Sequence, residues 1–497
     1  MFFMKILLVN LSSLTSAKIF VRLEPIGLER ISQALRRAGH EIRLLDLQIF
    51  THAEYFRELD SFRPRAVGFS LNYFPQVPEV LGLAMETKRR LSGSFVFVGG
   101  HSASFIANDL INHGQGAIDC VVRGEGEALA PRLVEEMFDG KLENLPGVVT
   151  PNGSGPPPAL ISSLDEPLPA RDLTRKRNKY FIGQMDPCAS IEFTRGCPWD
   201  CSFCSGWTFY GRTYRKASPE VIAEDLSRIR EPNVFIVDDV AFAQPEHAMA
   251  VGREIEKRKI RKRYHLETRC DVLVRNREVF EYWRGLGLEY ILLGVEAIDE
   301  EGLKLWRKRV SPSVNFQALE IARKLGVLPA ANIITDPDWD EERFRLVREW
   351  ALNVPALVHF SVNTPYPGTE TWYTESRRLT TRDYRLFDVQ HAVLPTKLSL
   401  RKFYEELFKT QEVMNKKYLG VAAIRKTLSI VFGLLLQGQT NFLKMIWQFN
   451  RAYSPERQYA DHFQEVKYAL KEPPAEVHKP DPTELFVHLP KAEKMSR

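Results

Sequence analysis

The chain has 497 residues, which is too long for one ordinary domain and suggests about three. With 44% hydrophobic and 26% charged residues it has the composition of a folded protein, which excludes an intrinsically disordered chain. The net charge of +5 is small for this length, so we predict no nucleic acid partner. The N-terminal residues lack the pattern of a secretory signal, and a cytoplasmic location is expected.

Residues 1–140 alternate short β-rich runs with helical patterns. The expected strands cover residues 5–9, 41–46, 66–70, 95–98 and 119–122. Five strands separated by helices predict an α/β, Rossmann-like domain with a doubly wound parallel sheet. Such a sheet binds its ligands beyond the carboxyl ends of the strands.

Small and polar residues follow the last three of these strands. The candidate ligand-binding residues are Ser70, Leu71, Asn72, Gly99, Gly100, His101, Gly124, Glu125 and Gly126. Glycines let the backbone approach a large ligand closely. Tight turns in an ordinary Rossmann-like domain would give the same pattern, so that alternative stays open.

A second alternating region follows a linker. Residues 141–187 contain a run rich in proline and glycine at 151–158 and are predicted to be the linker. Strand-like runs then appear at 191–194, 234–237, 264–267, 290–294, 331–334 and 358–362. Six β/α units within residues 188–390 predict a partial (β/α)6 barrel of the TIM type, with its active site at the carboxyl ends of the strands.

The remaining chain is predicted to form a helical domain at 391–455 and an extended tail at 456–497. No apolar run reaches the length of about 20 residues that spans a bilayer. One segment, 428–436, places Leu428, Val431, Phe432, Leu435 and Leu436 on one helical face. It is either a core helix or an interfacial helix that makes peripheral contact with a membrane.

The first barrel strand is followed by three closely spaced cysteines, Cys197, Cys201 and Cys204. Three thiolates in a C-x3-C-x2-C loop can hold a [4Fe-4S] cluster and leave one iron without a protein ligand. Zinc is the alternative, because Cys188 could complete a four-cysteine site. Structural zinc sites usually pair their cysteines in two short knuckles, and Cys188 stands alone. Cys120 and Cys270 have no cysteine neighbour and are expected to pack in the core.

A C-x3-C-x2-C loop at this place in a barrel resembles the radical S-adenosylmethionine (SAM) superfamily, including the aromatic Phe203 before the last cysteine. The resemblance implies that SAM binds the open iron and that the reduced cluster cleaves it to a 5'-deoxyadenosyl radical. It further implies that SAM is contacted by residues after successive strands, namely Phe203, Asp238, Asp239, Glu267, Arg269 and Glu296. A role as helix caps or surface charges remains the alternative for the acidic residues.

The N-terminal domain, with its glycine-rich loops at 99–101 and 123–127, resembles the cobalamin-binding domain of B12-dependent radical SAM enzymes. The D-x-H-x-x-G motif is absent, and the loop at 10–20 contains no histidine. No histidine ligand to cobalt is therefore expected from this loop. Most members of this class are methyltransferases that act on unactivated sp3 carbons.

Segments 21–27, 97–104, 186–192, 336–340 and 379–387 resemble hopanoid C-3 methylases. This resemblance implies methylation of a hopanoid, with electrons from a donor such as flavodoxin or ferredoxin. The alternatives within the class are an anaerobic porphyrin cyclase and a phosphinate or amino-acid methylase. A non-enzymatic alternative is a cobalamin-binding sensor with a structural cluster.

Overall fold

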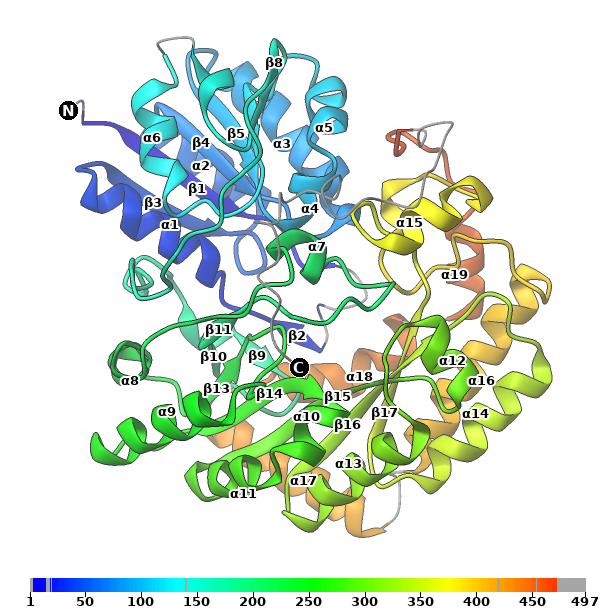
Figure 1. The fold of residues 1–497 in the computed structure, drawn as a ribbon. Helices are drawn as coiled ribbons and strands as arrows, with labels where there is room; N and C mark the ends of the chain where they lie inside the picture. Colours follow the sequence, from blue (N-terminus) through cyan, green and yellow to red (C-terminus); the bar gives the residue numbers. More distant parts are fainter. Residues whose placement is uncertain are drawn as a thin grey trace.

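The computed structural model describes residues 3–14, 18, 20–138, 141–417, 421–452 and 454–471. Two α/β units lie one above the other in Figure 1, with helices of the C-terminal region beside the second unit. This arrangement confirms the predicted fold class: a doubly wound parallel sheet, a six-stranded partial barrel and a helical C-terminal region.

The first unit is built on a seven-stranded sheet with the order β3-β1-β4-β5-β6-β7-β8. The strands are β1 (Lys5–Asn10), β3 (Glu41–Asp46), β4 (Ala66–Ser70), β5 (Phe95–Gly99), β6 (Cys120–Val122), β7 (Val148–Thr150) and β8 (Gly153–Ser154). The first five are parallel, as their almost continuous apolar sequences predict. The last two are antiparallel and extend the sheet with residues that the sequence assigned to the linker.

Helices cover both faces of this sheet. They are α1 (Ile26–Arg37), α2 (His52–Phe62), α3 (Val77–Arg90), α4 (His101–Phe105), α5 (Ala107–Gly114) and α6 (Leu129–Glu136). Leu28 and Leu35 of α1 pack with Ile6 and Leu8 on one face, and Val80 of α3 belongs to the cluster on the other face. A cluster on each face is the arrangement that a doubly wound fold requires.

The second unit is a parallel six-stranded sheet in sequential order: β10 (Cys188–Ile191), β13 (Asn233–Ile236), β14 (Arg263–Arg269), β15 (Leu288–Glu296), β16 (Leu328–Thr335) and β17 (Leu357–Val362). Its helices are α8 (Pro219–Arg228), α9 (Pro245–Lys257), α10 (Cys270–Arg275), α11 (Arg277–Leu286), α12 (Glu300–Leu305), α13 (Pro312–Lys324) and α14 (Glu341–Asn353). The first strand covers Cys188–Ile191 rather than the predicted residues 191–194, and it ends before Glu192.

Short elements complete the two units. An antiparallel pair, β2 (Val21–Arg22) with β9 (Phe181–Ile182), joins the first unit to the linker. A second pair, β11 (Thr194–Arg195) with β12 (Arg215–Lys216), brackets the cysteine loop, and α7 (Gly206–Tyr210) lies inside it.

The chain after the barrel returns to the first unit. It contains α15 (Glu370–Glu375), α16 (Leu400–Lys417), α17 (Val421–Leu436), α18 (Asn441–Ala452) and α19 (Pro455–Asp461). Tyr384, Phe387 and Leu470 are buried in the core cluster of the first unit. The predicted extended tail therefore begins with a helix and a packed segment, while its residues 472–497 lie outside the described residues. Among the described residues, no helix is both long and apolar enough to cross a bilayer.

Buried ion pairs tie the linker to both units. Arg171 contacts Glu24 at 2.9 Å and Asp225 of α8 at 2.6 Å, and the three side chains are almost fully buried. Buried charges are tolerated when they are paired in this way, and such pairs fix geometry more than they add stability. The linker thus holds the edge of the first sheet in a defined orientation to the barrel.

Candidate active site

The cysteine loop lies at the carboxyl end of β10, between β11 and α7. The main-chain N–H of Gly206 donates to Cys204 Sγ (3.3 Å), and the guanidinium of Arg269 donates to Cys201 Sγ (3.5 Å). The indole of Trp207 donates to the main-chain oxygen of Cys201 (2.9 Å), which fixes the loop against α7. The hydrogen bond from Gly206 favours the thiolate of Cys204, although burial outweighs it.

Glycine is required at the start of this loop. Gly196 has a φ of +94°, and a Cβ at that position would lie 2.4 Å from the main-chain oxygen of Thr213. A larger residue would push β11 and β12 apart. The tight turn therefore depends on Gly196.

The three thiols share one partly enclosed region. Burial raises the pKa of Cys197 and of Cys204 to about 12, and neighbouring thiols add to the effect. The thiolates consequently need a bound cation to form at neutral pH. Among the described residues, no three histidine, cysteine, aspartate or glutamate side chains are arranged to hold a single metal ion. A cubane cluster needs wider spacing, because each thiolate binds a different iron.

The fourth cysteine of the zinc alternative lies elsewhere. Cys188 is at the opposite end of β10, where it packs with Met185 and Phe235. Its Sγ donates to the main-chain oxygen of Ala189. Cys188 is therefore a packing residue, and so are the buried Cys120 and Cys270.

The two aspartates after β13 have different environments. Asp238 is buried and accepts hydrogen bonds from the main-chain N–H groups of Phe193 (2.8 Å) and Thr194 (3.0 Å), and from the Thr194 hydroxyl (2.6 Å). Burial nevertheless raises its pKa to about 7. These bonds occupy its carboxylate in shaping the chain before the cysteines. Asp239 accepts one bond, from the N–H of Gly196 (2.8 Å), and keeps an exposed side chain beside the loop.

The other predicted SAM contacts also lie at strand ends. Arg269 stacks on Trp199 at 4.7 Å and donates to the main-chain oxygen of Lys308 (2.6 Å). Glu296 accepts from Asn332 (2.8 Å) and pairs with Lys308 at 3.4 Å. Phe203 packs edge-on against Trp306, so it shapes the far side of the loop. Burial, with a contribution from Glu296, raises the pKa of Glu267 to about 7.

Several exposed side chains of the two units have shifted pKa values. Tyr73 is 52% exposed, but burial and the charge of Glu267 raise its pKa. Asp239 and His359 are also exposed, although burial raises the pKa of Asp239 and lowers that of His359. The charge of Glu267, in the barrel, acts on Tyr73, in the first unit, so these two side chains lie near each other.

Strand alternation explains which barrel residues face away from the helices. Leu266, Ile291, Ile333 and Val358 belong to the core cluster between the strands and their helices. The intervening residues face the opposite way, and they include His265, Glu267, Asn332 and His359. The sequence analysis did not select Tyr73, Lys308, Asn332 or His359. Polar residues at alternate positions of β14, β16 and β17 could have indicated which side chains face away from the helices.

The predicted cobalamin residues divide into two groups. Ser70, Leu71, Asn72, Gly99, Gly100 and His101 follow β4 and β5 at the sheet edge that faces the barrel. Gly100 has a φ of +108°, and a Cβ there would lie 2.6 Å from the main-chain oxygen of Leu71. His101 Nε2 lies 2.8 Å from Ser205 Oγ, the residue next to Cys204. This group therefore borders both the sheet edge and the cysteine loop.

The second group, Gly124, Glu125 and Gly126, contacts other parts of the protein. Glu125 pairs with Arg195 at 2.7 Å and with Arg215 at 2.8 Å, and it accepts the N–H of Ile161. A Cβ on Gly124 would lie 2.8 Å from Pro158, and one on Gly126 would lie 2.9 Å from Ile31. The linker and α1 fill the space beside these glycines. Glu125 thus joins the first unit to the barrel, while Gly124 and Gly126 pack against the linker and α1.

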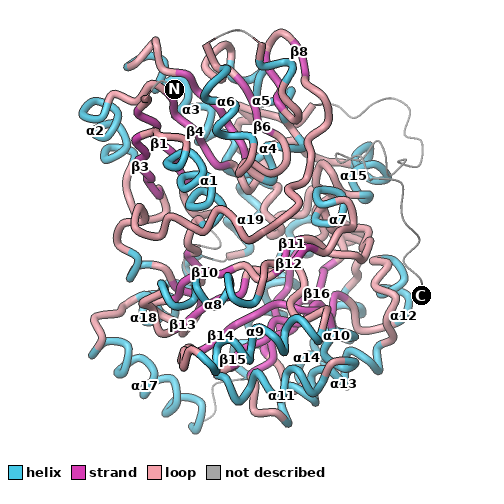
Figure 2. The backbone as a smooth tube through the Cα atoms, turned by 60° about the vertical axis from the view of Figure 1, so that its left-hand side comes forward, coloured by secondary structure: helices cyan, strands magenta, loops and turns pink. Residues whose placement is uncertain are grey.

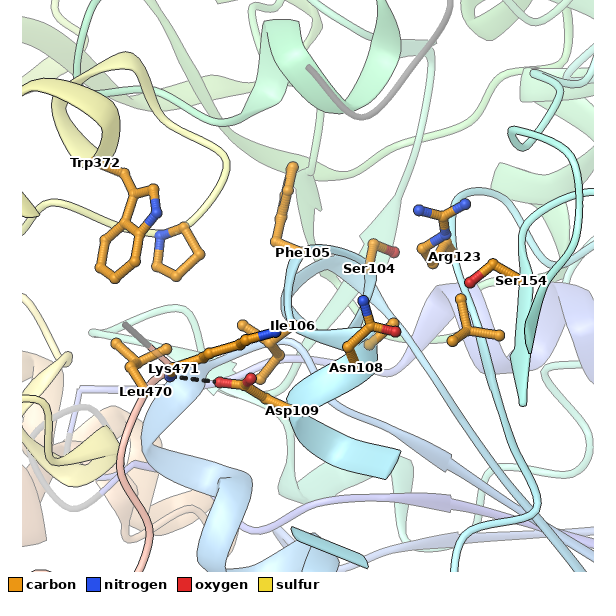
Figure 3. A pocket seen from close by; sticks show the side chains of 13 residues that line it. Ser104, Phe105, Ile106, Asn108, Asp109, Arg123, Ser154, Trp372, Leu470 and Lys471 are labelled. Atoms are coloured by element: carbon orange, nitrogen blue, oxygen red, sulfur yellow. Dashed lines mark hydrogen bonds between the residues drawn. The ribbon is translucent and has the colours of Figure 1, made fainter. Parts of the chain in front are cut away.

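A separate polar pocket of about 220 Å³ lies at the outer edge of the first unit. Figure 3 shows Asp109 and Lys471 on one side and Arg123, Asn108 and Ser154 on the other. Asp109 accepts the main-chain N–H of Lys471 (2.7 Å) and the hydroxyl of Tyr384 (2.7 Å). None of the predicted site residues lines this pocket, and its hydrogen bonds fasten the returning chain to α5.

The two units match two family models. Residues 13–134 match the B12 binding domain, and residues 191–351 match the radical SAM superfamily. The chain is 59% identical over 493 residues to the hopanoid C-3 methylase of Methylococcus capsulatus, covering 99% of this chain and 96% of that protein. The chain belongs to the B12-binding radical SAM family. The family confirms the predicted cofactors, a [4Fe-4S] cluster, SAM and cobalamin, and the predicted enzyme class of radical SAM methyltransferases.

Two solved structures support the fold. The cobalamin-dependent SAM radical enzyme OxsB, with aqua-cobalamin and SAM bound, aligns with a TM-score of 0.65 at 14% identity, over 94% of this chain and 85% of its own. The radical SAM methyltransferase TsrM of Kitasatospora setae, with cobalamin and a [4Fe-4S] cluster bound, aligns with a TM-score of 0.61 at 19% identity, over 75% of this chain and 74% of its own. Both B12-binding radical SAM structures share the two-unit architecture described above.

Proposed function

We propose that the protein methylates hopanoids at C-3, an unactivated sp3 carbon of the A ring. The observation that carries this proposal is the 59% identity to a hopanoid C-3 methylase over nearly the whole length of both proteins. The structure supports it because the sheet edge of the first unit meets the cysteine loop, where His101 contacts Ser205 at 2.8 Å. A carbon without a lone pair cannot attack a methyl donor directly, so it needs radical activation.

We propose a division of labour among the site residues and domains. In the barrel, residues 188–390, the cluster is held by Cys197, Cys201 and Cys204. The side chains that face SAM in this domain are those of Asp239, Glu267, Arg269 and Glu296. Asp238 and Phe203 position the cysteine loop. In residues 1–140, Ser70, Leu71, Asn72, Gly99, Gly100 and His101 face cobalamin. When bound, these groups supply a hydrogen abstractor and a transferable methyl group, while the surrounding protein keeps bulk water away from the reacting carbon.

The proposed partners follow from this chemistry. The cluster must be reduced, so we propose an electron donor such as flavodoxin or ferredoxin. The hopanoid is a membrane lipid, so we propose that the protein works at the inner face of the membrane by peripheral contact, without a spanning segment.

The test is anaerobic incubation of the reconstituted protein with methyl-labelled SAM, methylcobalamin, a reductant and a hopanoid dispersed in detergent. We expect labelled 3-methylhopanoid by mass spectrometry, together with 5'-deoxyadenosine. Formation of 5'-deoxyadenosine without a 3-methyl product would reject the hopanoid substrate and leave the radical SAM class intact. Labelling of a porphyrin instead would favour a cyclase-like enzyme.

A further inference from the structure

The C-terminal helices α17 and α18 present large apolar side chains to solvent. On α17 these are Leu428, Phe432, Leu435 and Leu436, spaced so that they share one helical face. On α18 they are Leu443, Ile446 and Trp447, again at helical spacing. Leu436 is 74% exposed and Trp447 is 62% exposed, which is unusual for two neighbouring helices of a folded protein. We call these seven residues the apolar face.

The charge of this segment is one-sided. Residues 421–452 contain Arg425, Lys426, Lys444 and Arg451 and no aspartate or glutamate. The whole chain, by contrast, has nearly equal numbers of basic and acidic residues, 68 and 63. Large apolar side chains combined with basic residues are typical of helices that lie in the headgroup region of a bilayer containing anionic lipids. A surface that binds another protein usually contains both acidic and basic residues. The absence of aspartate and glutamate from residues 421–452 therefore favours an anionic bilayer over a protein partner.

Helix α18 is attached to the linker directly before the barrel. At the start of α18, Asn441 donates to Asp186 (3.1 Å), two residues before β10. Gln439, in the turn between the two helices, is buried. Figures 1 and 2 show α17 at the end of the barrel away from the first unit, whereas α18 lies at the level of the barrel strands.

We propose that the apolar face docks the protein on the surface of an anionic bilayer. This inference rests on the proposed function, because a hopanoid resides in such a bilayer and the enzyme must collect it there. Docking needs no helix that spans the membrane, in agreement with the described helices.

The experiment is co-sedimentation of the full-length, cofactor-loaded protein with vesicles that contain phosphatidylglycerol or only phosphatidylcholine. We expect binding to the anionic vesicles that weakens with salt and little binding to the neutral ones. The double variant Phe432→Asp/Leu436→Asp should lose vesicle binding by more than tenfold, since two large apolar side chains that enter the bilayer are replaced by charged ones. Phe316→Asp, on α13 with 49% of Phe316 exposed, is the matched control and should bind as wild type.

Two further measurements keep the outcomes distinct. Methylation of detergent-dispersed hopanoid should be unchanged in the double variant, while methylation of hopanoid embedded in vesicles should fall with binding. Wild-type protein that fails to bind anionic vesicles overturns the docking proposal. So does a dimer by light scattering that the double variant converts to monomer, because the face would then join two copies. Vesicle binding without any hopanoid methylation would overturn the proposed substrate and leave the docking surface standing.

Discussion

The imidazole of His101 lies 2.8 Å from the hydroxyl of Ser205, and this contact joins the first sheet to the cysteine loop. His101 begins α4 after β5, whereas Ser205 directly follows Cys204. The ring of His101 also packs against Phe209 of α7 at 4.6 Å. These contacts fix the position of the cysteine loop relative to the sheet edge of the first unit, where cobalamin is proposed to bind.

Breaking this contact should uncouple the two halves of the reaction. We expect Ser205→Ala and His101→Ala each to lower the rate of product methylation about tenfold or more while 5'-deoxyadenosine is still formed, because misplacement between the units affects transfer more than radical formation. Iron content should stay at the wild-type level. His113→Ala, which removes a histidine that contacts Ala469 instead, is the control. Equal losses of methylation and 5'-deoxyadenosine would contradict this interpretation.

The cysteine loop gives the simplest test of the cluster. Cys201→Ala should abolish iron binding and the absorbance of the cluster, and with them 5'-deoxyadenosine and methylated product, while cobalamin still binds. Cys188→Ala should retain all of these, because its thiol packs among apolar side chains at the other end of β10. Full activity of Cys201→Ala in cells would instead support the sensor with a structural cluster.

Glu267 makes the stability of the cofactor-free protein depend on pH. Its pKa is about 7 in the folded protein and near 4.5 when unfolded, so between these values the folded state binds more protons. Stability from this group is therefore lost as pH rises through the window and levels off above it. The free energy of unfolding of Glu267→Gln should exceed that of wild type by about 1 kcal/mol at pH 8. At pH 4 the two proteins should have the same free energy of unfolding. The surface variant Glu246→Gln should follow wild type at both pH values by circular dichroism.

Arg195 should be important for folding rather than for chemistry. Its guanidinium pairs with Glu125 (2.7 Å), Glu127 (2.8 Å) and Glu192 (2.7 Å), and all four side chains are largely buried. Arg195→Met would leave three buried carboxylates without their shared cation and should cost about 3–5 kcal/mol in urea unfolding. Arg323→Met breaks an exposed pair with Glu320 and should cost less than about 1 kcal/mol. A small loss for Arg195→Met would show that the units dock mainly through apolar contacts.

Much of the fold could be predicted because its signals are local. Apolar runs such as 6–9 and 95–98, separated by helical patterns, predict parallel strands buried on both faces. The short hairpin of β7 and β8 was missed, since a three-residue strand beside prolines carries little periodic signal. The helix at Pro455–Asp461 was missed for the same reason, although Ser454 and Pro455 are a recognisable helix start.

The sequence by itself determined the cysteine loop and the two α/β units, because these depend on residue type, close spacing and strand order, and its resemblance to a known family implied the cofactors. Only the tertiary structure decided which of the neighbouring acids remain available. It engages Asp238 and Glu125 in hydrogen bonds and ion pairs with distant residues, whereas Asp239 keeps an exposed side chain beside the cysteine loop. Those partners lie far away in the chain, so no local pattern reports them. The free energy of a buried carboxylate depends on which charges and donors the fold brings to it.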